Sequence, residues 1–351
     1  MPKAFVFTRH GGPEAQALVD RAKPVPGPGE LLVAVRAAGV NPVDWKLREG
    51  LRRPGAEEPR FPVVLGSEVA GTVEALGPDV SGFRVGDAVF GNPSDGGYAE
   101  YTLLPVALAA RKPDAVSFTD AAALPVAAAT ALDGVRQLAL PRGATLLVTG
   151  AGGGVGASAL QLAVASGLRV VGLASAGKKE FVESLGAVHV ASGPGFAARV
   201  GAVTPDGVDG VLDLVGGEVL QEAGPLVADR TKLVSAGDRE GVTRLGGAFV
   251  VRARAADVLG DLAARVADGS LDPRVTRVVP LDRAAEALRE VEEGHARGKT
   301  VIEIGGGDPG GDPGGHPGRH VGRDSDVHPG GRPGRHSGGD RDGRPGGEVR
   351  R

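Results

Sequence analysis

The sequence predicts an α/β fold in which a β-rich domain is followed by a doubly wound parallel sheet and a disordered tail. Short β-like runs punctuated by glycine and proline fill residues 1–125, a pattern typical of a compact β-rich domain. Strands alternate with helices from about residue 126 to 270, and such alternation implies a parallel sheet with helices on both faces. Residues 305–351 consist almost entirely of Gly, Pro, Arg, Asp and His.

Composition limits the classes of protein to which this chain can belong. It has 351 residues, of which 41% are hydrophobic and 24% charged, with a formal net charge of −3. These values describe a globular chain of about two domains and give no electrostatic basis for nucleic-acid binding. The apolar run at the N-terminus is too short for a signal peptide, and no run approaches the roughly 20 apolar residues that span a bilayer. We therefore expect a cytoplasmic protein with neither a nucleic-acid nor a membrane partner.

In the β-rich part, residues 31–37, 69–73 and 87–90 have the length and composition of strands. Between the first two lies Asn41-Pro42-Val43-Asp44, which is a good turn and helix-start signal with Asp44 in a capping position. Trp45, the only tryptophan, follows directly. A single tryptophan beside a helix start packs in a core or forms an aromatic wall, and the sequence leaves both open.

A glycine cluster between a predicted strand at 145–149 and a predicted helix starting near Val155 is the most informative motif, although a glycine-rich turn between a strand and a helix is often only a turn. Ala151, Gly153 and Gly156 fall on the A-x-G-x-x-G spacing, which lets the backbone approach a pyrophosphate. The N-terminus of the following helix offers free N–H groups and a positive dipole end to that pyrophosphate. The predicted contacts to a dinucleotide in this loop are Ala151, Gly152, Gly153, Gly154, Val155 and Gly156.

The second strand of this unit, at 168–174, ends at Ser175, where the adenosine ribose is read. Folds that prefer NAD usually place Asp or Glu there to bind the 2′-hydroxyl group. This chain has Ser175 followed by Ala176, Gly177, Lys178 and Lys179. Two cations and no acid favour a 2′-phosphate, so we expect NADPH as the cofactor and Ser175 and Lys178 among its contacts.

Further strands are expected near 210 and 231, and a helix and a final strand within 271–304 that return to the first domain. We predict a catalytic domain over 1–125, completed by 271–304, a cofactor domain over 126–270, and a tail over 305–351. The tail buries too little apolar surface to offset about 1–2 kcal/mol of backbone entropy per residue. Its four histidines have no scaffold to fix a metal, so we expect disorder without a metal site.

Several sequence blocks, in order, resemble the medium-chain dehydrogenase/reductase superfamily, and within it the zinc-independent quinone oxidoreductase branch that includes zeta-crystallin. The resemblance spans about residues 1–304. It implies a GroES-like N-terminal domain and a Rossmann cofactor domain, with the nicotinamide in the cleft between them. The blocks are AAGVNPVD at 37–44, VLGSEVAGTV at 64–73, VGDAV at 85–89, GAGGGVG at 150–156, LGA at 185–187 and GK at 298–299.

The residues themselves argue against zinc chemistry. A catalytic zinc needs three positioned protein ligands, and a structural zinc usually has four thiolates; the chain contains no cysteine. Zinc-dependent relatives carry Gly-His-Glu where this chain has Gly66-Ser67-Glu68, so Glu68 is expected to be a structural carboxylate. Without a Lewis acid to stabilise an alkoxide, hydride transfer requires an acceptor that is already electrophilic. Quinones and α,β-unsaturated carbonyls are such acceptors.

The resemblance also implies roles for single residues. It places the loop of residues 41–44 at the cleft, with Asn41 as a contact to substrate and nicotinamide ribose and Asp44 as a further catalytic candidate. Trp45, which follows this loop, is a catalytic candidate as an aromatic wall for a flat substrate. It places Thr130 on the nicotinamide side and Gly216, Ala236 and Gly237 beneath the cofactor at strand ends. The chain departs from many relatives at Ser192-Gly193, where they have a tyrosine that closes over the 2′-phosphate.

We therefore expect an NADPH-dependent, zinc-independent reductase of quinones or activated alkenes. Two alternatives stay open. One is an enoyl-thioester reductase of a biosynthetic pathway, and the other is a non-catalytic NADPH-binding redox sensor. The run LGGAFVV at 245–251 is a candidate edge strand for a homodimer.

Overall fold

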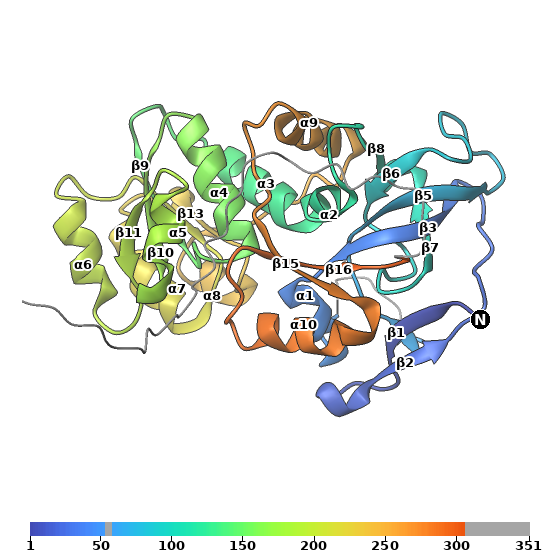
Figure 1. The fold of residues 1–351 in the computed structure, drawn as a ribbon. Coiled ribbons are helices and arrows are strands. Elements are labelled where there is room, and N and C mark those ends of the chain that lie inside the picture. Colours follow the sequence, from blue (N-terminus) through green and yellow to red (C-terminus); the bar gives the residue numbers. More distant parts are fainter. Residues whose placement is uncertain (53–57, 306–351) are drawn as a thin grey trace, which may run out of the picture. The chain divides into compact units, whose positions relative to one another are not determined.

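The computed structural model describes residues 1–52 and 58–305, and the tail from residue 306 onward lies outside the described residues. Two large sheets dominate this part of the chain (Figure 1). One is the expected parallel sheet, and the other carries the N-terminal strands. Both expectations about the fold class are confirmed.

The parallel sheet has six strands in the order β11-β10-β9-β12-β13-β14, and every neighbouring pair is parallel. The chain order reverses direction beside β9, so the carboxyl ends of β9 and β12 flank the switch point at which such sheets bind ligands. Its strands are β9 (Thr145–Thr149), β10 (Arg169–Ala174), β11 (Val188–Ala191), β12 (Gly210–Asp213), β13 (Leu233–Ser235) and β14 (Ala248–Phe249).

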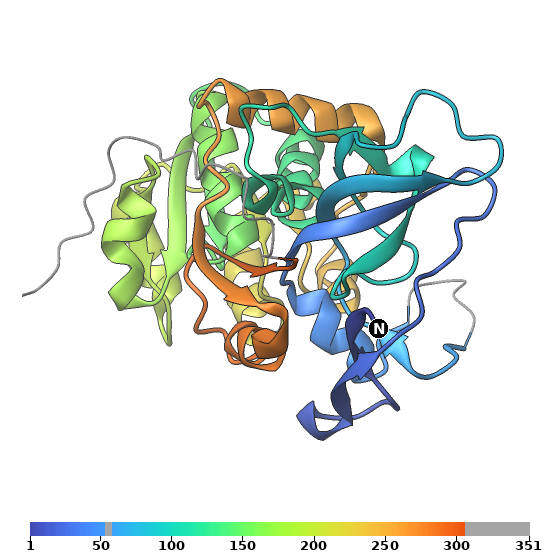
Figure 2. The ribbon, with the colours of Figure 1, turned by 45° about the vertical axis from the view of Figure 1, so that its right-hand side comes forward.

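Helices cover both faces of this sheet, as Figure 2 shows for the strands of the green segment. One face packs Leu146, Val148 and Leu212 against α3, α4, α5 and α9. The other packs Leu147, Val171 and Val211 against α6, α7 and α8. The alternation of buried side chains along each strand produces this division. The helices are α3 (Ala129–Leu138), α4 (Gly154–Ala165), α5 (Lys179–Glu183), α6 (Phe196–Val203), α7 (Gly217–Ala223), α8 (Arg239–Arg244) and α9 (Ala256–Ala267).

The N-terminal strands form a seven-stranded sheet in the order β15-β16-β3-β5-β6-β8, with β7 also paired to β3. A smaller sheet has the order β2-β1-β4. The bounds of these strands are β1 (Lys3–Phe7), β2 (Gln16–Asp20), β3 (Glu30–Gly39), β4 (Val63–Val64), β5 (Val69–Leu76), β6 (Ala88–Gly91), β7 (Tyr101–Pro105) and β8 (Ala109–Arg111).

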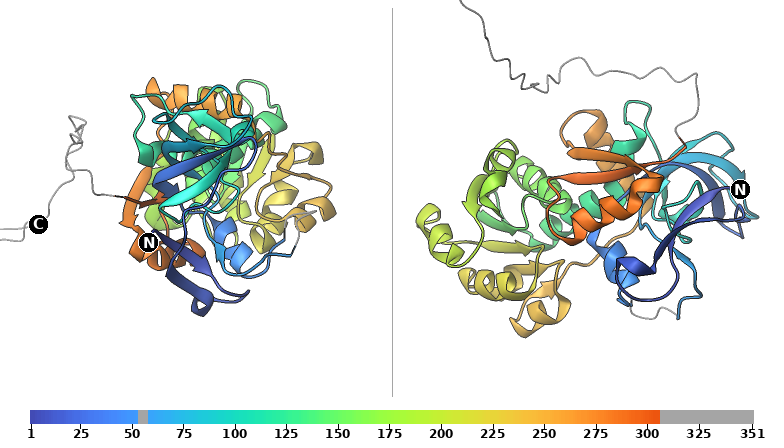
Figure 3. Two further views of the ribbon diagram at one scale, coloured as in Figure 1. Left: turned by 90° about the vertical axis from the view of Figure 1, so that its right-hand side faces the viewer. Right: turned by 60° about the horizontal axis from the view of Figure 1, so that its bottom comes forward.

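After α9 the chain returns to the first sheet through β15 (Val275–Pro280), α10 (Ala284–Glu292) and β16 (Lys299–Glu303). Strand β16 pairs antiparallel with β3, Val301 lying opposite Gly39. Helix α10 lies beside α1 (Pro42–Arg48), as the right-hand view in Figure 3 shows, and Arg48 of α1 pairs with Glu292 of α10. The return expected for residues 271–304 therefore brings Lys299 next to the loop that opens α1.

The two sheets are joined by α2 (Phe118–Ala121) and by a π-helical turn at Leu124–Ala128 that leads into α3. A π turn widens the helical hydrogen-bond pattern and often occurs at functional sites. Here it leaves the N–H group of Val126 free to bond a side chain of the first sheet. Among residues 1–52 and 58–305, no helix has the length and apolar content to cross a membrane.

Candidate active site

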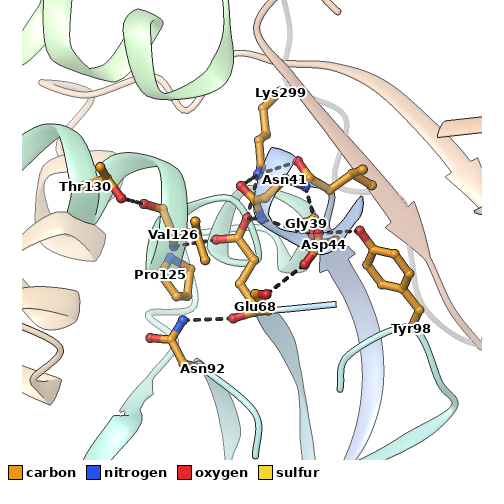
Figure 4. Close-up of polar contacts among 12 residues, drawn as sticks. Gly39, Asn41, Asp44, Glu68, Asn92, Tyr98, Pro125, Val126, Thr130 and Lys299 are labelled. Carbon is orange, nitrogen blue, oxygen red and sulfur yellow. Dashed lines mark hydrogen bonds and ion pairs between the residues drawn. The ribbon is translucent and has the colours of Figure 1, made fainter. Parts of the chain in front are cut away.

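Asn41 caps the N-terminus of α1 and is only 2% exposed. Its amide nitrogen Nδ2 donates to Glu68 Oε1 at 2.7 Å, and its amide oxygen Oδ1 accepts from Lys299 Nζ at 2.6 Å (Figure 4). Both ends of the amide are thus fixed by buried charged groups. Asn41 therefore has one defined orientation just beyond the end of β3.

Glu68 and Lys299 form a buried ion pair with Lys299 Nζ 2.6 Å from Glu68 Oε1. The side chains are 0% and 3% exposed, respectively. Lys299 also donates to Val40 O, and Glu68 Oε2 accepts from the N–H group of Val126 in the π turn. A buried pair is tolerated only when further hydrogen bonds satisfy its remaining polar atoms, and this one meets that condition.

Asp44 caps the N-terminus of α1. Its carboxylate accepts from the N–H group of Asn41, the hydroxyl of Ser67 and the phenol of Tyr98, and it completes a capping box with Asn41. Burial raises the pKa of Asp44, while the bonds from Ser67 and Tyr98 oppose that shift. Burial, followed by the adjacent Asp44, raises the pKa of Tyr98 well above its ordinary value, so the phenol remains a donor.

Trp45 packs against the core cluster that contains Phe5 and Phe7. Its indole Nε1 is buried without a hydrogen-bond partner in the described part of the chain. The structure thus places this ring against the core of the N-terminal part, as one of the two sequence interpretations has it. Its role as an aromatic wall for substrate stays a prediction.

Thr130 is 8% exposed in α3 and donates to Val126 O. Its hydroxyl oxygen accepts from Arg252 Nη1 at 2.7 Å. Arg252 in turn donates from Nε to Asp133 Oδ2 at 3.0 Å and from Nη2 to Pro125 O. The predicted cofactor contact Thr130 therefore lies in a rigid network that shares Val126 with Glu68.

The glycine-rich loop connects β9 to α4, which begins at Gly154 with Gly153 as its N-cap. Gly153 forms a parallel β-bridge with Gly298, whereas the backbone N–H groups of Val155 and Gly156 have no hydrogen-bond partner within residues 1–52 and 58–305. A Cβ atom on Gly156 would lie 2.4 Å from Gly150 O, so only glycine lets helix and strand approach this closely. This arrangement fits the binding of a pyrophosphate at a helix N-terminus.

The other predicted cofactor contacts lie at neighbouring strand ends. Asp213, at the end of β12, accepts from Thr149 Oγ1 at 2.7 Å and from Ser235 Oγ at 2.6 Å, which ties together β9, β12 and β13. A Cβ atom on Gly237 would lie 2.8 Å from Gly216 N, and Ala236 N donates to Asp213 O. Gly216, Ala236 and Gly237 are therefore brought together beside the glycine-rich loop.

Ser175 and Lys178 line an open pocket of about 480 Å³ at the end of β10. Lys178 Nζ donates to Ala296 O at 2.6 Å, and burial, followed by the nearby charge of Arg297, lowers the pKa of Lys178. This hydrogen bond holds the Lys178 side chain against the return segment between α10 and β16. The pocket walls are Ser175, Gly177, Lys178, Thr276, Arg277, Glu290, His295 and Arg297.

The return segment also joins the glycine-rich loop to the polar cluster. Gly298 N donates to Gly152 O at 3.0 Å, and a Cβ atom on Gly154 would lie 3.1 Å from Lys299 Cδ. Lys299 thus runs from the loop to Asn41 and Glu68. The loop and the cluster are therefore adjacent and are connected through Gly298 and Lys299.

Sequence reasoning missed the roles of Lys299 and Arg252. The Gly298-Lys299 block identified a family but gave no contact, because the partner Glu68 is 231 residues away in the chain. Arg252 follows β14 without any local motif. No local pattern distinguishes either residue, because Lys299 follows another basic residue, Arg297, and Arg252 is followed by Arg254.

Comparisons with known proteins agree with this architecture. The alcohol dehydrogenase GroES-like domain family matches residues 27–114, and the zinc-binding dehydrogenase family matches residues 185–302. The 2-methylene-furan-3-one reductase of Solanum lycopersicum is 34% identical over 319 residues, covering 86% of this chain and 78% of that protein. The chloroplastic NADPH-dependent alkenal/one oxidoreductase of Arabidopsis thaliana is also 34% identical, over 86% of this chain and 79% of its own.

A solved structure of the quinone oxidoreductase from Coxiella burnetii superposes with a TM-score of 0.77 and 29% identity, covering 86% of this chain and 99% of that one. The fold and the site define an oxidoreductase of the medium-chain dehydrogenase/reductase superfamily. Within it, the chain belongs to the quinone oxidoreductase branch.

Proposed function

We propose that this protein is a zinc-independent reductase that uses NADPH to reduce a quinone or an α,β-unsaturated carbonyl compound. The observation that carries the proposal is the position of Lys299. Its side chain passes the glycine-rich loop at Gly154, and its ammonium group lies between Asn41 and Glu68. A nucleotide bound on the loop would therefore extend toward that cluster. The names of the plant relatives agree with an enone-type acceptor and NADPH.

The free N–H groups at the start of α4 would hold the pyrophosphate, and Gly216, Ala236 and Gly237 would support the nicotinamide half. When bound, NADPH supplies a hydride from its nicotinamide ring. The residues of this chain orient the two reactants, and proximity of this kind lowers the barrier by several kcal/mol. Thr130, fixed by Arg252, and Asn41, fixed by Lys299 and Glu68, are the polar groups available for that task.

The donor set supports chemistry without zinc. Ser67 replaces the histidine of zinc-dependent relatives, and its hydroxyl donates to Asp44. Glu68 is already neutralised by the ammonium group of Lys299. Within residues 1–52 and 58–305, no group of three His, Asp or Glu side chains is arranged to hold a metal. An acceptor that is electron-poor before hydride arrives fits this donor set.

The test is oxidation of NADPH and NADH in the presence of 1,4-benzoquinone, an alkyl vinyl ketone and an enoyl thioester, with protein dialysed against a chelator. We expect NADPH oxidation with the first two acceptors at a rate that added zinc does not raise. Turnover of the thioester alone would identify an enoyl-thioester reductase instead. Tight NADPH binding without oxidation by any acceptor would point to a redox sensor.

A further inference from the structure

The pocket at the end of β10 has two walls from distant parts of the chain. Ser175, Gly177 and Lys178 form one wall, and residues of β15, α10 and the return segment before β16 form the other. The walls are joined by the hydrogen bond from Lys178 Nζ to Ala296 O. Ser175 stands where a ribose is read in this fold, so the second wall faces that position.

The positive charges of this pocket are not all balanced. Arg277 is paired with Glu286 and Glu290. The guanidinium group of Arg297, by contrast, has no hydrogen-bond or ion-pair partner within the described residues, and the side chain is exposed. Lys178 donates only to a backbone carbonyl group. Two cations that lack a carboxylate partner therefore line the same pocket, and each would gain from an anion placed between them.

The electrostatics of Lys178 support this picture. Burial lowers the pKa of Lys178, the positive charge of Arg297 lowers it further, and the carboxylate of Glu290, which also lines the pocket, opposes the shift. The two groups are thus close enough to repel one another. A phosphate dianion in the pocket would replace this repulsion with attraction to both groups.

The turn at Ser192-Gly193, which the structure describes on the other side of the ribose position, offers no free cationic group that could bind a phosphate. This turn, where relatives have a tyrosine, is fastened by Arg199, which donates to Ala191 O and Gly193 O. Ser192 N donates to Ala174 O. The turn therefore presents no aromatic ring, and the guanidinium group of Arg199 is bonded to the turn's own carbonyl groups.

We infer that Arg297, on the return segment, binds the 2′-phosphate of NADPH together with Lys178 and Ser175 and takes the place of the missing tyrosine. This inference rests on the proposed function. His295, which also lines the pocket, is exposed and contacts Glu293. The cofactor's phosphate would then be read by the segment that leads, two residues later, into Lys299 of the active site. Discrimination between NADPH and NADH would thus depend on both parts of the chain rather than on the parallel-sheet part alone.

The test is calorimetric binding of 2′,5′-ADP and of 5′-AMP to the full chain, which needs no substrate and no turnover. Arg297→Ala is expected to weaken 2′,5′-ADP binding about tenfold, the loss of one charge-assisted hydrogen bond, and to leave 5′-AMP binding unchanged. Arg297→Lys should retain part of the affinity because it keeps the charge. Arg289→Ala, which removes an exposed arginine of α10 outside the pocket, is the matched control and should bind like the parent.

The outcomes separate this inference from the function on which it rests. If the parent protein binds 2′,5′-ADP more tightly than 5′-AMP and Arg297→Ala binds both as the parent does, the inference is wrong and the proposed function stands. If the parent binds neither NADPH nor 2′,5′-ADP, both are wrong. An equal loss for 5′-AMP and 2′,5′-ADP in Arg297→Ala would indicate a general disturbance of the fold and would also overturn the inference.

Discussion

The stability of the protein depends on the buried ion pair between Glu68 and Lys299. Removing one partner of a buried pair leaves an uncompensated charge and costs about 3–5 kcal/mol of stability. We therefore expect Lys299→Met to lower the free energy of unfolding by that amount, as measured by urea denaturation. The same variant should lose reductase activity, because Asn41 loses the donor to its amide oxygen.

The double variant Glu68→Gln with Lys299→Met tests the physical reason. It removes both charges and keeps an amide that accepts from Val126, so most of the lost stability should return. Activity should not return with it, since the amide oxygen of Asn41 would still lack its donor. A double variant as unstable as Lys299→Met would show that packing, rather than charge, makes Lys299 necessary.

Asp44 gives the stability a pH dependence whose sign is fixed by its raised pKa. Between the ordinary value of 3.8 and the raised pKa, the folded protein keeps a proton that the unfolded chain releases. Stability from this group is therefore complete below pH 3.8 and is lost as the pH rises through the raised pKa.

Asp44→Asn cannot titrate, but its amide oxygen can accept from Asn41 and Tyr98 while its NH₂ group donates to Ser67. We expect the parent to lose stability relative to Asp44→Asn as the pH rises across this window, measured by urea denaturation at several pH values. Asp44→Ala, which leaves three donors unsatisfied, should cost about 1–3 kcal/mol. A pH-independent difference between the parent and Asp44→Asn would contradict the assignment.

The sequence was sufficient for the capping role of Asp44, because a cap depends on residues a few positions apart. It was not sufficient for the partners of Asn41. Glu68 and Lys299 reach Asn41 only after β5 and β16 have joined opposite sides of β3. Contacts of that kind depend on strand order, which no local pattern encodes. The catalytic roles of Asn41, Asp44 and Trp45 stay predictions.

At the level of elements, the approach of α4 to β9 depends on Gly156. A Cβ atom there would lie 2.4 Å from Gly150 O and 2.6 Å from Ala151 Cα. Both are backbone atoms, so relieving the clash would require a shift of the main chain. We expect Gly156→Ala to destabilise the protein by about 1–3 kcal/mol through overpacking and to weaken nucleotide binding. Thermal unfolding and NADPH titration would measure the two effects.

Gly201→Ala is the matched control, because Gly201 lies in α6 and a Cβ atom there would meet nothing within 4 Å. That variant should be stabilised by as much as about 1 kcal/mol, since alanine favours a helix over glycine. Should Gly156→Ala bind NADPH and unfold like the parent, the close contact between helix and strand would not be needed for the site.

The strands of the parallel sheet could be predicted because each is a short, continuous apolar run between segments of helical character. The expected positions near 145, 169, 210 and 231 correspond to β9, β10, β12 and β13. The π turn at Leu124–Ala128 could not be predicted. Its sequence, LPVAA, has a proline that is compatible with the first turn of any helix and does not specify a π turn. The wider turn places the Val126 N–H group at the carboxylate of Glu68, an arrangement that tertiary contacts determine.

At the scale of the molecule, the six-stranded sheet ends in two edges of different character. β14 contributes only Ala248–Phe249 to one edge, and Val251 just beyond it is 74% exposed. β11 forms the other edge, with Val188 51% exposed. An edge strand offers unpaired N–H and C=O groups to a second copy of the chain. The run at 245–251 is the edge that we predict for a homodimer.

In a dimer with two-fold symmetry, each interface residue is present twice near the axis. Val251→Asp would then place two carboxylates at the contact, and like charges there cost stability. We expect light scattering after size-exclusion chromatography to give a dimer for the parent and a monomer for Val251→Asp. Val188→Asp introduces the same charge at the opposite edge of the same sheet and should remain dimeric. Dissociation by Val188→Asp alone would move the interface to β11, and a monomeric parent would remove the dimer altogether.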